Sequence, residues 1–549
     1  MRSPDRLTWP GQTRANDLPA KVSQTELPSS DKQRWLLFLV PSASDMLFAA
    51  LLFGLSCGAL GRLLLRDAGI GWHIRNGQQM LLTHAITRTD SFSSTMNGKP
   101  WFAWEWLYDI VFAAIHHALG LNGVVFYSAA IIAATFVLTL HLGLRRGGNL
   151  PITLFLLILA LGASAVHFLA RPHVVSWLLT VVWFELLDSA AGASASEQMK
   201  RLLWLPVVML LWVNVHGGFV LGFVLLAVYL AGGAIEYGTN REQRDELAAW
   251  LKRLGGASVL VLMASFINPY TYQLHLHVYR YLTDSFLMNR ISEFLSPDFH
   301  GAAQQCFAVL VLITIVTVAS TRRRPSATHL LVLLVAVYGG FYATRSLPTS
   351  SLLMVLIITP IISQSVARLG ENADAARWVR GLAAWTHSFG LRMETLEKSL
   401  YGHFWLVLVF VLGLWACGHQ GRIGSTQFIN AYFDEKRFPV EASETIAARG
   451  IHGPIFSLDY WGGYLIYRLY PETQVVADDR HDMYGDAFLK DYLKAVLVQP
   501  GWDDALDKLR VDWVLMPADS PLANILRLKA GWESVYEDKT AVLLRRVGK

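Results

Sequence analysis

The chain has 549 residues, of which 53% are hydrophobic and 16% are charged, and its formal net charge is +5. A soluble domain carries about 25% charged residues, so this composition excludes an ordinary globular protein and favours many helices in a lipid bilayer. Most Lys and Arg residues flank apolar segments, which is a topology signal and argues against a nucleic-acid partner. We therefore predict a multi-pass membrane protein.

The N-terminal segment, residues 1–33, is polar and rich in Pro, Ser and Gln, and it contains no apolar run typical of a cleavable signal peptide. We expect a disordered cytoplasmic tail. The three cysteines, Cys57, Cys306 and Cys417, all lie in apolar segments, so they predict neither a disulfide framework nor a thiolate metal site.

Apolar runs of about the length that crosses a bilayer dominate residues 34–418, which we expect to form the membrane domain. One doubtful run, 106–120, is short and carries Asp109 and two histidines. We expect it to be an interfacial or partly inserted helix within a first outer loop, 66–121. The other runs predict about eleven crossings, near 46–65, 122–144, 150–169, 174–190, 202–215, 218–235, 255–267, 303–321, 328–344, 349–367 and 402–418.

The basic loops test this count, because short loops rich in Lys and Arg stay in the cytoplasm. With eleven crossings and a cytoplasmic N-terminus, all strongly basic loops become cytoplasmic, whereas a further crossing at 106–120 would place them outside. The same count places the C-terminus outside. The basic groups are Arg145-Arg146, Lys200-Arg201, Arg241 to Arg253, Arg322 to Arg324 and Arg368 to Lys398.

The composition changes at about residue 419, where charge returns and long apolar runs end. Segments such as "VEASETIAARG", "QVVADD" and "DWVLMP" alternate helix and strand patterns over roughly 110 residues, the size of one small α/β domain. We expect residues 419–549 to form an extracytoplasmic α/β domain, and we find no Gly-rich phosphate loop or zinc spacing in its sequence.

Asp67 directly follows the first apolar run. An isolated acid here is most simply a surface charge, but the following "WHIRNGQQML" predicts an amphipathic helix whose Trp72 suits the headgroup region. Such a helix would hold Asp67 and His73 at the mouth of the helix bundle, near a bound lipid's head group.

Glu105 lies among three tryptophans in "PWFAWEWLYDI", four residues before Asp109 and on the same helical face. An aromatic belt with incidental acids explains this pattern equally well. Partial desolvation would raise the pKa of Glu105, which suits an acid, a base or an orienting partner. Asp90 in "RTDSFSST" is a weaker catalytic candidate, because a turn or a helix cap also explains it.

Cationic and polar residues fall at the expected outer helix ends. Arg171, His173, His216 and Arg345 suit binding of a donor phosphate, since a guanidinium binds phosphate in a bidentate way; anchoring at the membrane interface is the alternative. His275 and His277 lack an evident third metal ligand, and we expect them to be structural. Further residues expected to line the site are His73, Asn214, Asn268, Tyr270, Arg290 and Glu293.

Seven motifs together resemble a bacterial set of membrane proteins placed among the polytopic glycosyltransferases of the GT-C fold. Relatives in that group include protein mannosyltransferases, oligosaccharyltransferases and lipid A aminoarabinose transferases. The resemblance covers most of the chain and implies a GT-C fold in a bacterial inner membrane. The motifs are "GWHIRNGQ", "TDSFSST", "PWFAWEWL", "RPH", "NVHGG", "INPY" and "DYWGGYLI".

The first outer loop of GT-C enzymes carries a catalytic Asp, and their sugar donor is a polyprenyl phosphate or diphosphate. The resemblance therefore implies that role for Asp67. Many members pair this acid with a neighbouring Asp or Glu, whereas residues 68–70 here are Ala, Gly and Ile. The second acid would then be Glu105 or Asp90. A divalent cation stays open, and no metal ligands are assigned.

Three functions fit these features. The first is an inverting glycosyltransferase, in which Asp67 deprotonates an acceptor hydroxyl on a glycan, lipid or protein while Arg171, Arg345 and a histidine stabilise the departing phosphate. The second is a lipid or solute transporter or flippase, whose site would lie near the bilayer midplane between repeated halves, although no internal repeat is visible. The third is a non-catalytic membrane scaffold that binds through its outer domain.

Overall fold

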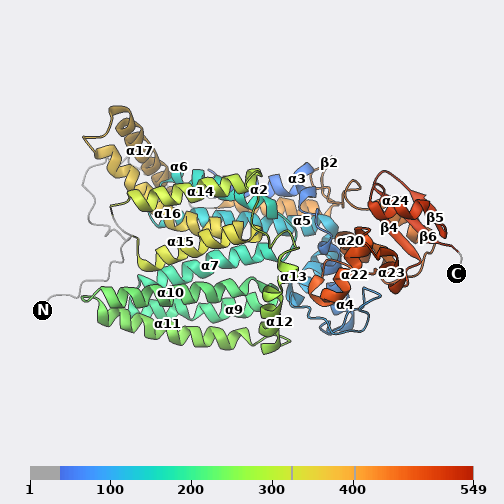
Figure 1. Cartoon of the computed structure of the whole chain (residues 1–549). Helices are drawn as coiled ribbons and strands as arrows, with labels where there is room; N and C mark the ends of the chain where they lie inside the picture. Colours follow the sequence, from blue (N-terminus) through green and yellow to red (C-terminus); the bar gives the residue numbers. More distant parts are fainter. Residues whose placement is uncertain (1–36, 323–324, 401–402, 548–549) are drawn as a thin grey trace.

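The computed structural model describes residues 37–322, 325–400 and 403–547. The predicted tail, 1–33, lies outside the described residues, as do Arg323 and Arg324. The long helices run side by side along the molecule, and the C-terminal domain lies at one end of the bundle they form (Figure 1).

Each of the eleven apolar runs is helical in the structure. Within the described ranges, seven helices are long and apolar enough to cross a membrane, and α2, α15 and α18 are shorter apolar helices. This is a multi-pass helical membrane fold, as predicted. The helices that carry the runs are α2 (Ala43–Ser56), α3 (Gly58–Leu63), α5 (Trp106–Arg145), α6 (Leu150–Ser164), α7 (His173–Ala191), α9 (Trp204–Val215), α10 (Val220–Thr239), α11 (Arg244–Ser265), α14 (Ala302–Ser320), α15 (Ala327–Tyr342), α16 (Leu347–Glu371) and α18 (Phe404–Gly418).

Helix α5 is broken at Gly120, whose φ of 62° and ψ of −160° are open to glycine but not to other residues. Its 40 residues would extend about 60 Å at 1.5 Å per residue, twice the roughly 30 Å of a hydrocarbon core. If residues 121–145 cross the membrane, residues 106–119 therefore lie beyond it. That they lie in the interface stays a prediction.

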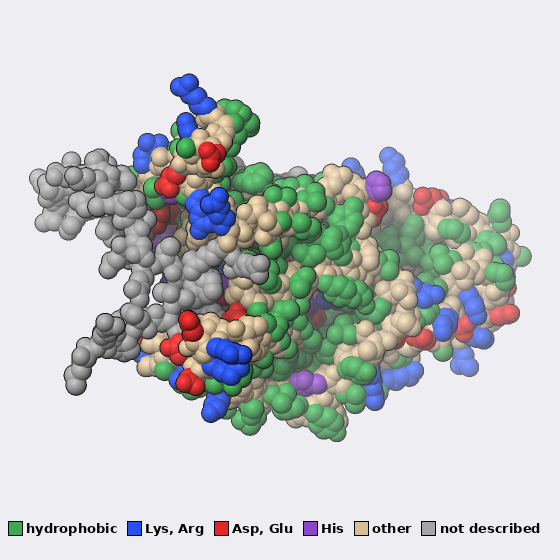
Figure 2. Space-filling view, turned by 60° about the vertical axis from the view of Figure 1, so that its left-hand side comes forward, with side chains coloured by type: hydrophobic (Ala, Val, Ile, Leu, Met, Phe, Trp, Pro, Cys, Tyr) green, Lys and Arg blue, Asp and Glu red, His purple; other side chains and the backbone are tan. Residues whose placement is uncertain are grey.

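One end of the bundle collects the basic loops. Arg253 of α11 donates a 2.6 Å hydrogen bond to Gln198 of α8 (Ala195–Leu202). At the same end, Glu397 of α17 (Arg377–Ser399) accepts the backbone N–H groups of Ala43 and Ser44 and so caps α2. Figure 2 shows charged side chains at both ends of the molecule and a broad hydrophobic band between them. The described basic loops and the C-terminal domain thus lie at opposite ends of the bundle (Figure 1). The number of crossings stays a prediction.

The C-terminal domain contains a four-stranded sheet in the order β3-β4-β6-β5, in which β3 and β4 are parallel and the other pairs are antiparallel. The core of β4 and β6 is an unbroken buried apolar run, because helices and the bundle side cover both faces. The sequence therefore correctly predicts an α/β fold here. The strands are β3 (Ile455–Ser457), β4 (Trp513–Pro517), β5 (Trp532–Glu537) and β6 (Ala541–Arg546), with a hairpin of β1 (Arg422–Ile423) and β2 (Thr426–Gln427) before them and the helices α19 (Val440–Ala448), α20 (Asp459–Leu469), α21 (His481–Tyr484), α22 (Asp486–Val496), α23 (Trp502–Lys508) and α24 (Pro521–Leu528).

The first outer loop and the C-terminal domain pack against each other. Helix α4 (Gly69–Thr83) contacts α20 so closely that a Cβ on Gly71 would lie 2.2 Å from the carbonyl oxygen of Gly463. Residue Ser93 forms a parallel β-bridge with Val475. The motifs "GWHIRNGQ" and "DYWGGYLI" therefore meet in space, and their glycines permit the contact. The short helices α12 (Tyr272–Thr283) and α13 (Ser285–Met288) complete this end of the bundle.

Candidate functional site

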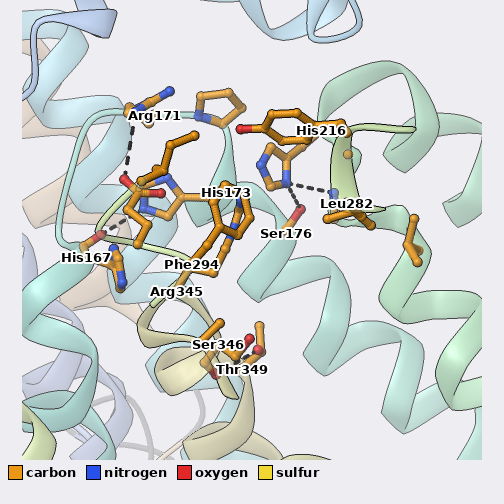
Figure 3. A pocket seen from close by; sticks show the side chains of 18 of the residues that line it. His167, Arg171, His173, Ser176, His216, Leu282, Phe294, Arg345, Ser346 and Thr349 are labelled. Atoms are coloured by element: carbon orange, nitrogen blue, oxygen red, sulfur yellow. Dashed lines mark hydrogen bonds and ion pairs between the residues drawn. The ribbon is translucent and has the colours of Figure 1, made fainter. Parts of the chain in front are cut away.

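A cavity of about 960 Å³ lies where the helix bundle meets the C-terminal domain. Its walls come from the ends of α7, α10, α15 and α16 nearest the C-terminal domain, from residues 66–109 and from the segment Asp479–Asp482. Figure 3 shows Arg171, His173, His216 and Arg345 around this space. The predicted site residues that line it are Asp67, Glu105, Arg171, His173, His216, Glu293 and Arg345.

Asp67 and Arg171 form an ion pair in the cavity wall. Nη1 of Arg171 lies 3.1 Å from Oδ2 of Asp67 and 4.0 Å from Oε1 of Glu293. The other oxygen of Asp67 accepts the N–H of Gly69 at 2.8 Å, so the turn into α4 fixes the carboxylate. Arg171 directly precedes Pro172, the N-cap residue of α7. A carboxylate and a guanidinium therefore lie in direct contact.

Arg171 and Arg345 act on the same carboxylate. Burial alone would raise the pKa of Glu293, but the positive charges of Arg171 and Arg345 outweigh it and lower this pKa to about 2. Burial alone would lower the pKa of Arg171, but Asp67 and Glu293 raise it above its usual range. The guanidinium of Arg345 also stacks on Phe294, with 4.5 Å to the ring centre. Both arginines are thus charged and face one cavity.

Glu105 lies deeper, between two histidines. Its carboxylate oxygens are 3.7 Å from Nε2 of His73 and 3.6 Å from Nε2 of His216. The side chain is only 10% exposed, and burial raises the pKa of Glu105 to about 7. This carboxyl group can therefore hold a proton near neutral pH.

The Nε2 atom of His73 faces Glu105. Its Nδ1 lies 2.6 Å from Oδ1 of Asp109, whose other oxygen accepts a 2.6 Å hydrogen bond from Asn76. Burial lowers the pKa of His73 to about 3, so the ring is neutral. One hydrogen lies between Nδ1 and Asp109, and Nε2 has no hydrogen-bond partner within the described residues. Nε2 faces the carboxyl group of Glu105.

The Nε2 atom of His216 also faces Glu105. Its Nδ1 accepts the N–H of Gly218 at 3.0 Å and lies 2.8 Å from the hydroxyl of Ser176 (Figure 3). Trp212 donates to that hydroxyl oxygen at 2.7 Å, which leaves the hydroxyl hydrogen for Nδ1. The ring hydrogen of neutral His216 is therefore on Nε2 and points at Glu105.

Asp479 of the C-terminal domain is a site residue that the sequence reasoning missed. A Cβ on Gly69 would lie 2.5 Å from Oδ2 of Asp479 and 2.9 Å from Oδ1 of Asp67, so both carboxylates border one glycine. Trp72 donates a 3.0 Å hydrogen bond to Asp479. Burial raises the pKa of Asp479 to about 7, with the charge of Asp67 adding to this effect and that of Arg171 opposing it. The second acid beside Asp67 comes from this domain.

The prediction of Asp90 as a catalytic residue needs correction. Its side chain is buried and does not reach the cavity. Its carboxylate accepts the N–H groups of Phe92 and Ser93 and forms a 2.7 Å ion pair with Arg480. The turn reading was therefore the better one, and Asp90 positions Arg480, which itself lines the cavity.

Five predicted lining residues lie outside the cavity wall: His73, which is buried behind it, and Asn214, Asn268, Tyr270 and Arg290. Asn214 accepts a 2.9 Å hydrogen bond from the indole of Trp106, and Asn268 accepts one from the N–H of Tyr270. The hydroxyl of Tyr270 accepts the N–H of Ala103 at 2.9 Å. Their hydrogen-bonding capacity is used to fix loops, and Arg290 stacks on Phe286 instead of facing the cavity.

The histidines of "QLHLHVY" also have local partners. His275 contacts the hydroxyl of Ser265, and His277 lies 3.0 Å from Asp482. Within the described part of the chain, no three or more His, Cys, Asp or Glu side chains are grouped so as to hold a metal ion.

No protein-family model and no curated protein matches the sequence. Among solved structures, ArnT from Cupriavidus metallidurans bound to undecaprenyl phosphate aligns with 94% of this chain and 98% of its own, at 12% identity and a TM-score of 0.51. The oligosaccharyltransferase AglB from Archaeoglobus fulgidus, in complex with an inhibitory peptide and a dolichol-phosphate, aligns over 89% of this chain and 69% of its own, at 11% identity and a TM-score of 0.56.

The chain has a GT-C-like fold. The alignments include the C-terminal domain as well as the helix bundle, since they cover 94% and 89% of the chain. The fold implied by the sequence motifs is thereby confirmed, while identities this low carry no residue roles from those proteins to this one.

Proposed function

We propose that this protein is an inverting glycosyltransferase that moves a sugar from a polyprenyl-phosphate carrier to an acceptor hydroxyl. The observation that carries this proposal is one cavity that holds the Asp67 carboxylate, the Arg171 and Arg345 guanidinium groups and an apolar extension between helices. These are the groups that a base, a leaving phosphate and a lipid chain each require.

The apolar extension runs between α10, α15 and α16. Its lining residues include Val224, Val335, Gly339 and Leu353, all from segments that would lie at membrane depth. A prenyl chain in this space would place its phosphate at the polar mouth, beside Arg171. The GT-C-like proteins of similar fold were solved with undecaprenyl phosphate and with a dolichol-phosphate, which supports a carrier of this class.

Arriving phosphate would compete with Asp67 for Arg171. In the structure the guanidinium of Arg171 is shared by Asp67 and Glu293. The singly charged phosphodiester of a polyprenyl-phosphate sugar still has two free oxygens that can bind a guanidinium in a bidentate way, so its binding would release Asp67 toward the acceptor. Donor binding and base activation are then one event.

In the proposed reaction, Asp67 accepts the proton of the acceptor hydroxyl while the hydroxyl oxygen bonds to the anomeric carbon. The bond from that carbon to the phosphate oxygen breaks, and its electron pair leaves with the phosphate. Arg171 and Arg345 stabilise the charge that develops there. Glu105, held between the two imidazoles of His73 and His216, would orient the sugar through its own proton.

The residues beside Asp67 do not fit a divalent cation. The carboxylates of Asp67 and Asp479 both border Gly69, and the guanidinium of Arg171 already lies 3.1 Å from Asp67. We infer that Arg171 supplies the positive charge that a metal would supply, and no step is assigned to a metal.

We also propose an orientation in which the N-terminus is cytoplasmic and the C-terminal domain lies outside a bacterial inner membrane. The basic loops at the far end of the bundle support it. Labelling of cysteines placed at Asn97 and Asp503 tests it: both should react with an impermeant reagent from outside, and labelling of only one would contradict the topology.

The proposed reaction is tested with purified protein and a panel of polyprenyl-phosphate sugars. We expect one donor to be consumed with inversion at the anomeric carbon and with release of polyprenyl phosphate. A protein that moves the intact lipid between leaflets without cleaving it would instead be a flippase.

A further inference from the structure

A second cavity, of about 530 Å³, lies at the other end of the bundle. It is lined by α7, α10, α15 and α16, the same four helices that line the first cavity. The two linings approach each other on α16, where Leu353 belongs to the first and Leu356 to the second. Phe184 of α7 and Val332 of α15, which lie between the linings in sequence, are fully buried. The second cavity is therefore a separate site.

The acidic groups of the second cavity already have partners. Nη2 of Arg146 lies 2.6 Å from Glu185 and 3.1 Å from Asp188. Asp188 also accepts a 3.0 Å hydrogen bond from the hydroxyl of Tyr229 and contacts His329 at 2.7 Å. These carboxylates are thus satisfied by the protein and are not offered to a cation.

The basic groups of the second cavity, by contrast, outnumber its acidic groups. Arg145, Arg146 and Arg201 line the cavity against two acids, so it carries a net positive charge. The Nη2 group of Arg146 already contacts both acids, whereas the side chain of Arg145 is exposed. Arg201 donates one hydrogen bond, from Nη1 to the carbonyl oxygen of Ser189.

Guanidinium groups are the part of this cavity that suits an anion, because they match the oxygens of phosphate. The N-terminus of α15 is already capped: the N–H of Ala327 donates a 2.9 Å hydrogen bond to Glu236, and the side chain of Ser326 accepts the N–H of His329. Apolar side chains of α16, such as Ile357 and Ile361, form another wall, against which an acyl or prenyl chain would pack.

We propose that this second cavity binds a phosphate group, carried either by a membrane lipid or by a water-soluble phosphate ester. The site is distinct from the proposed transferase site, lies at the opposite end of the bundle and needs no sugar transfer to operate. The chemistry that recognises the ligand is the positive charge and the N–H groups of Arg145 and Arg201.

The test uses an Arg145→Gln/Arg201→Gln variant, which removes two cations but keeps the ion pairs of Arg146. An Arg241→Gln/Lys252→Gln variant removes two exposed basic residues of the same end that do not line the cavity, and serves as the matched control. Delipidated protein is titrated with dioctanoyl phosphatidic acid, glycerol 3-phosphate and dioctanoylglycerol, and the unfolding midpoint is followed. Arg145→Gln alone, with an exposed side chain, replaces the double variant if that variant does not fold.

We expect phosphatidic acid to raise the midpoint of the wild type and of the control. The double variant should need roughly tenfold more ligand, the ratio that follows from loss of about 1.4 kcal/mol of binding free energy. Protection by glycerol 3-phosphate as well would identify a soluble phosphate as sufficient, and protection by phosphatidic acid alone would identify a lipid. Equal binding by the double variant, equal protection by dioctanoylglycerol, or no binding to the wild type would overturn the proposal.

Discussion

The two acidic walls of the outer cavity use the same functional group in opposite ways. Asp67 is 21% exposed and paired with Arg171, whereas Glu105 is 10% exposed and lies between two neutral imidazoles. A carboxylate beside a guanidinium stays ionised and can accept a proton, while one that is desolvated retains its own. The environment of a carboxyl group, more than its residue type, therefore decides whether it acts as a base or holds its proton and orients a ligand.

Removing Arg171 should have the largest effect of the variants on this comparison. Arg171→Gln keeps a hydrogen-bond donor but removes the charge that would stabilise both Asp67 and the departing phosphate. We expect transfer to fall by about 10²-fold or more, the scale for loss of one electrostatic stabiliser, and donor binding to weaken. Steady-state transfer and donor-binding assays measure the two effects. Arg290→Gln, outside the cavity, is the matched control and should behave as the wild type.

Changing Glu105 should alter the pH dependence of the protein's stability. Because its pKa rises from 4.5 unfolded to about 7 folded, the folded protein keeps a proton that the unfolded chain loses. The stability of the wild type should therefore fall as pH rises from 4.5 to 7, by about 3.5 kcal/mol at 1.4 kcal/mol per unit.

Glu105→Gln should lack that part of the decline, so its unfolding midpoint should gain on the wild type as pH rises. Thermal unfolding at pH 5 and pH 7.5 measures the difference. Transfer should fall by about tenfold if Glu105 only orients the sugar. A loss larger than that of Asp67→Asn would instead make Glu105 the base.

Asp90→Asn should affect stability and leave the chemistry nearly intact. The change breaks the buried ion pair with Arg480, and loss of one partner of such a pair costs about 3–5 kcal/mol. Transfer per folded molecule should change by less than about threefold, since Asp90 does not reach the cavity. Unfolding and transfer measured on the same preparation separate the two effects, and a selective loss of transfer would restore Asp90 as a catalytic candidate.

Chelation should have the smallest effect. If Arg171 supplies the charge beside Asp67, treatment with EDTA followed by removal of the chelator should leave transfer unchanged. Restoration of a lost activity by Mg²⁺ or Mn²⁺ would show that a metal acts in the cavity and would contradict the role of Arg171 as the source of positive charge beside Asp67.

The sequence was sufficient for the bundle and for one half of the site. Apolar runs and basic loops report on lipid contact directly, so the helices and the segregation of charge at the two ends were predictable. Asp67, Arg171 and Arg345 were found because charged residues at helix ends are conspicuous in such a chain. Their approach to one cavity needed only a shared end of the bundle.

The other half depends on contacts that no local pattern encodes. Asp479 meets Asp67 only because α20 packs on α4 through Gly71 and Gly463. The charge-dense "ADDRHD" was the one available signal, and nothing in it names its partner. Asp90 was misassigned for the same reason, since its ion-pair partner, Arg480, lies in that same distant segment.

The most direct test of the account compares donor binding and transfer in Asp67→Asn. The amide keeps the size of the carboxylate but cannot accept the acceptor's proton, so transfer should fall by about 10²-fold or more. Binding of the polyprenyl-phosphate sugar should persist, and the unfolding midpoint should stay near that of Asp298→Asn, a matched change at an exposed outer acid. Wild-type transfer by Asp67→Asn would contradict the assignment of Asp67 as the base.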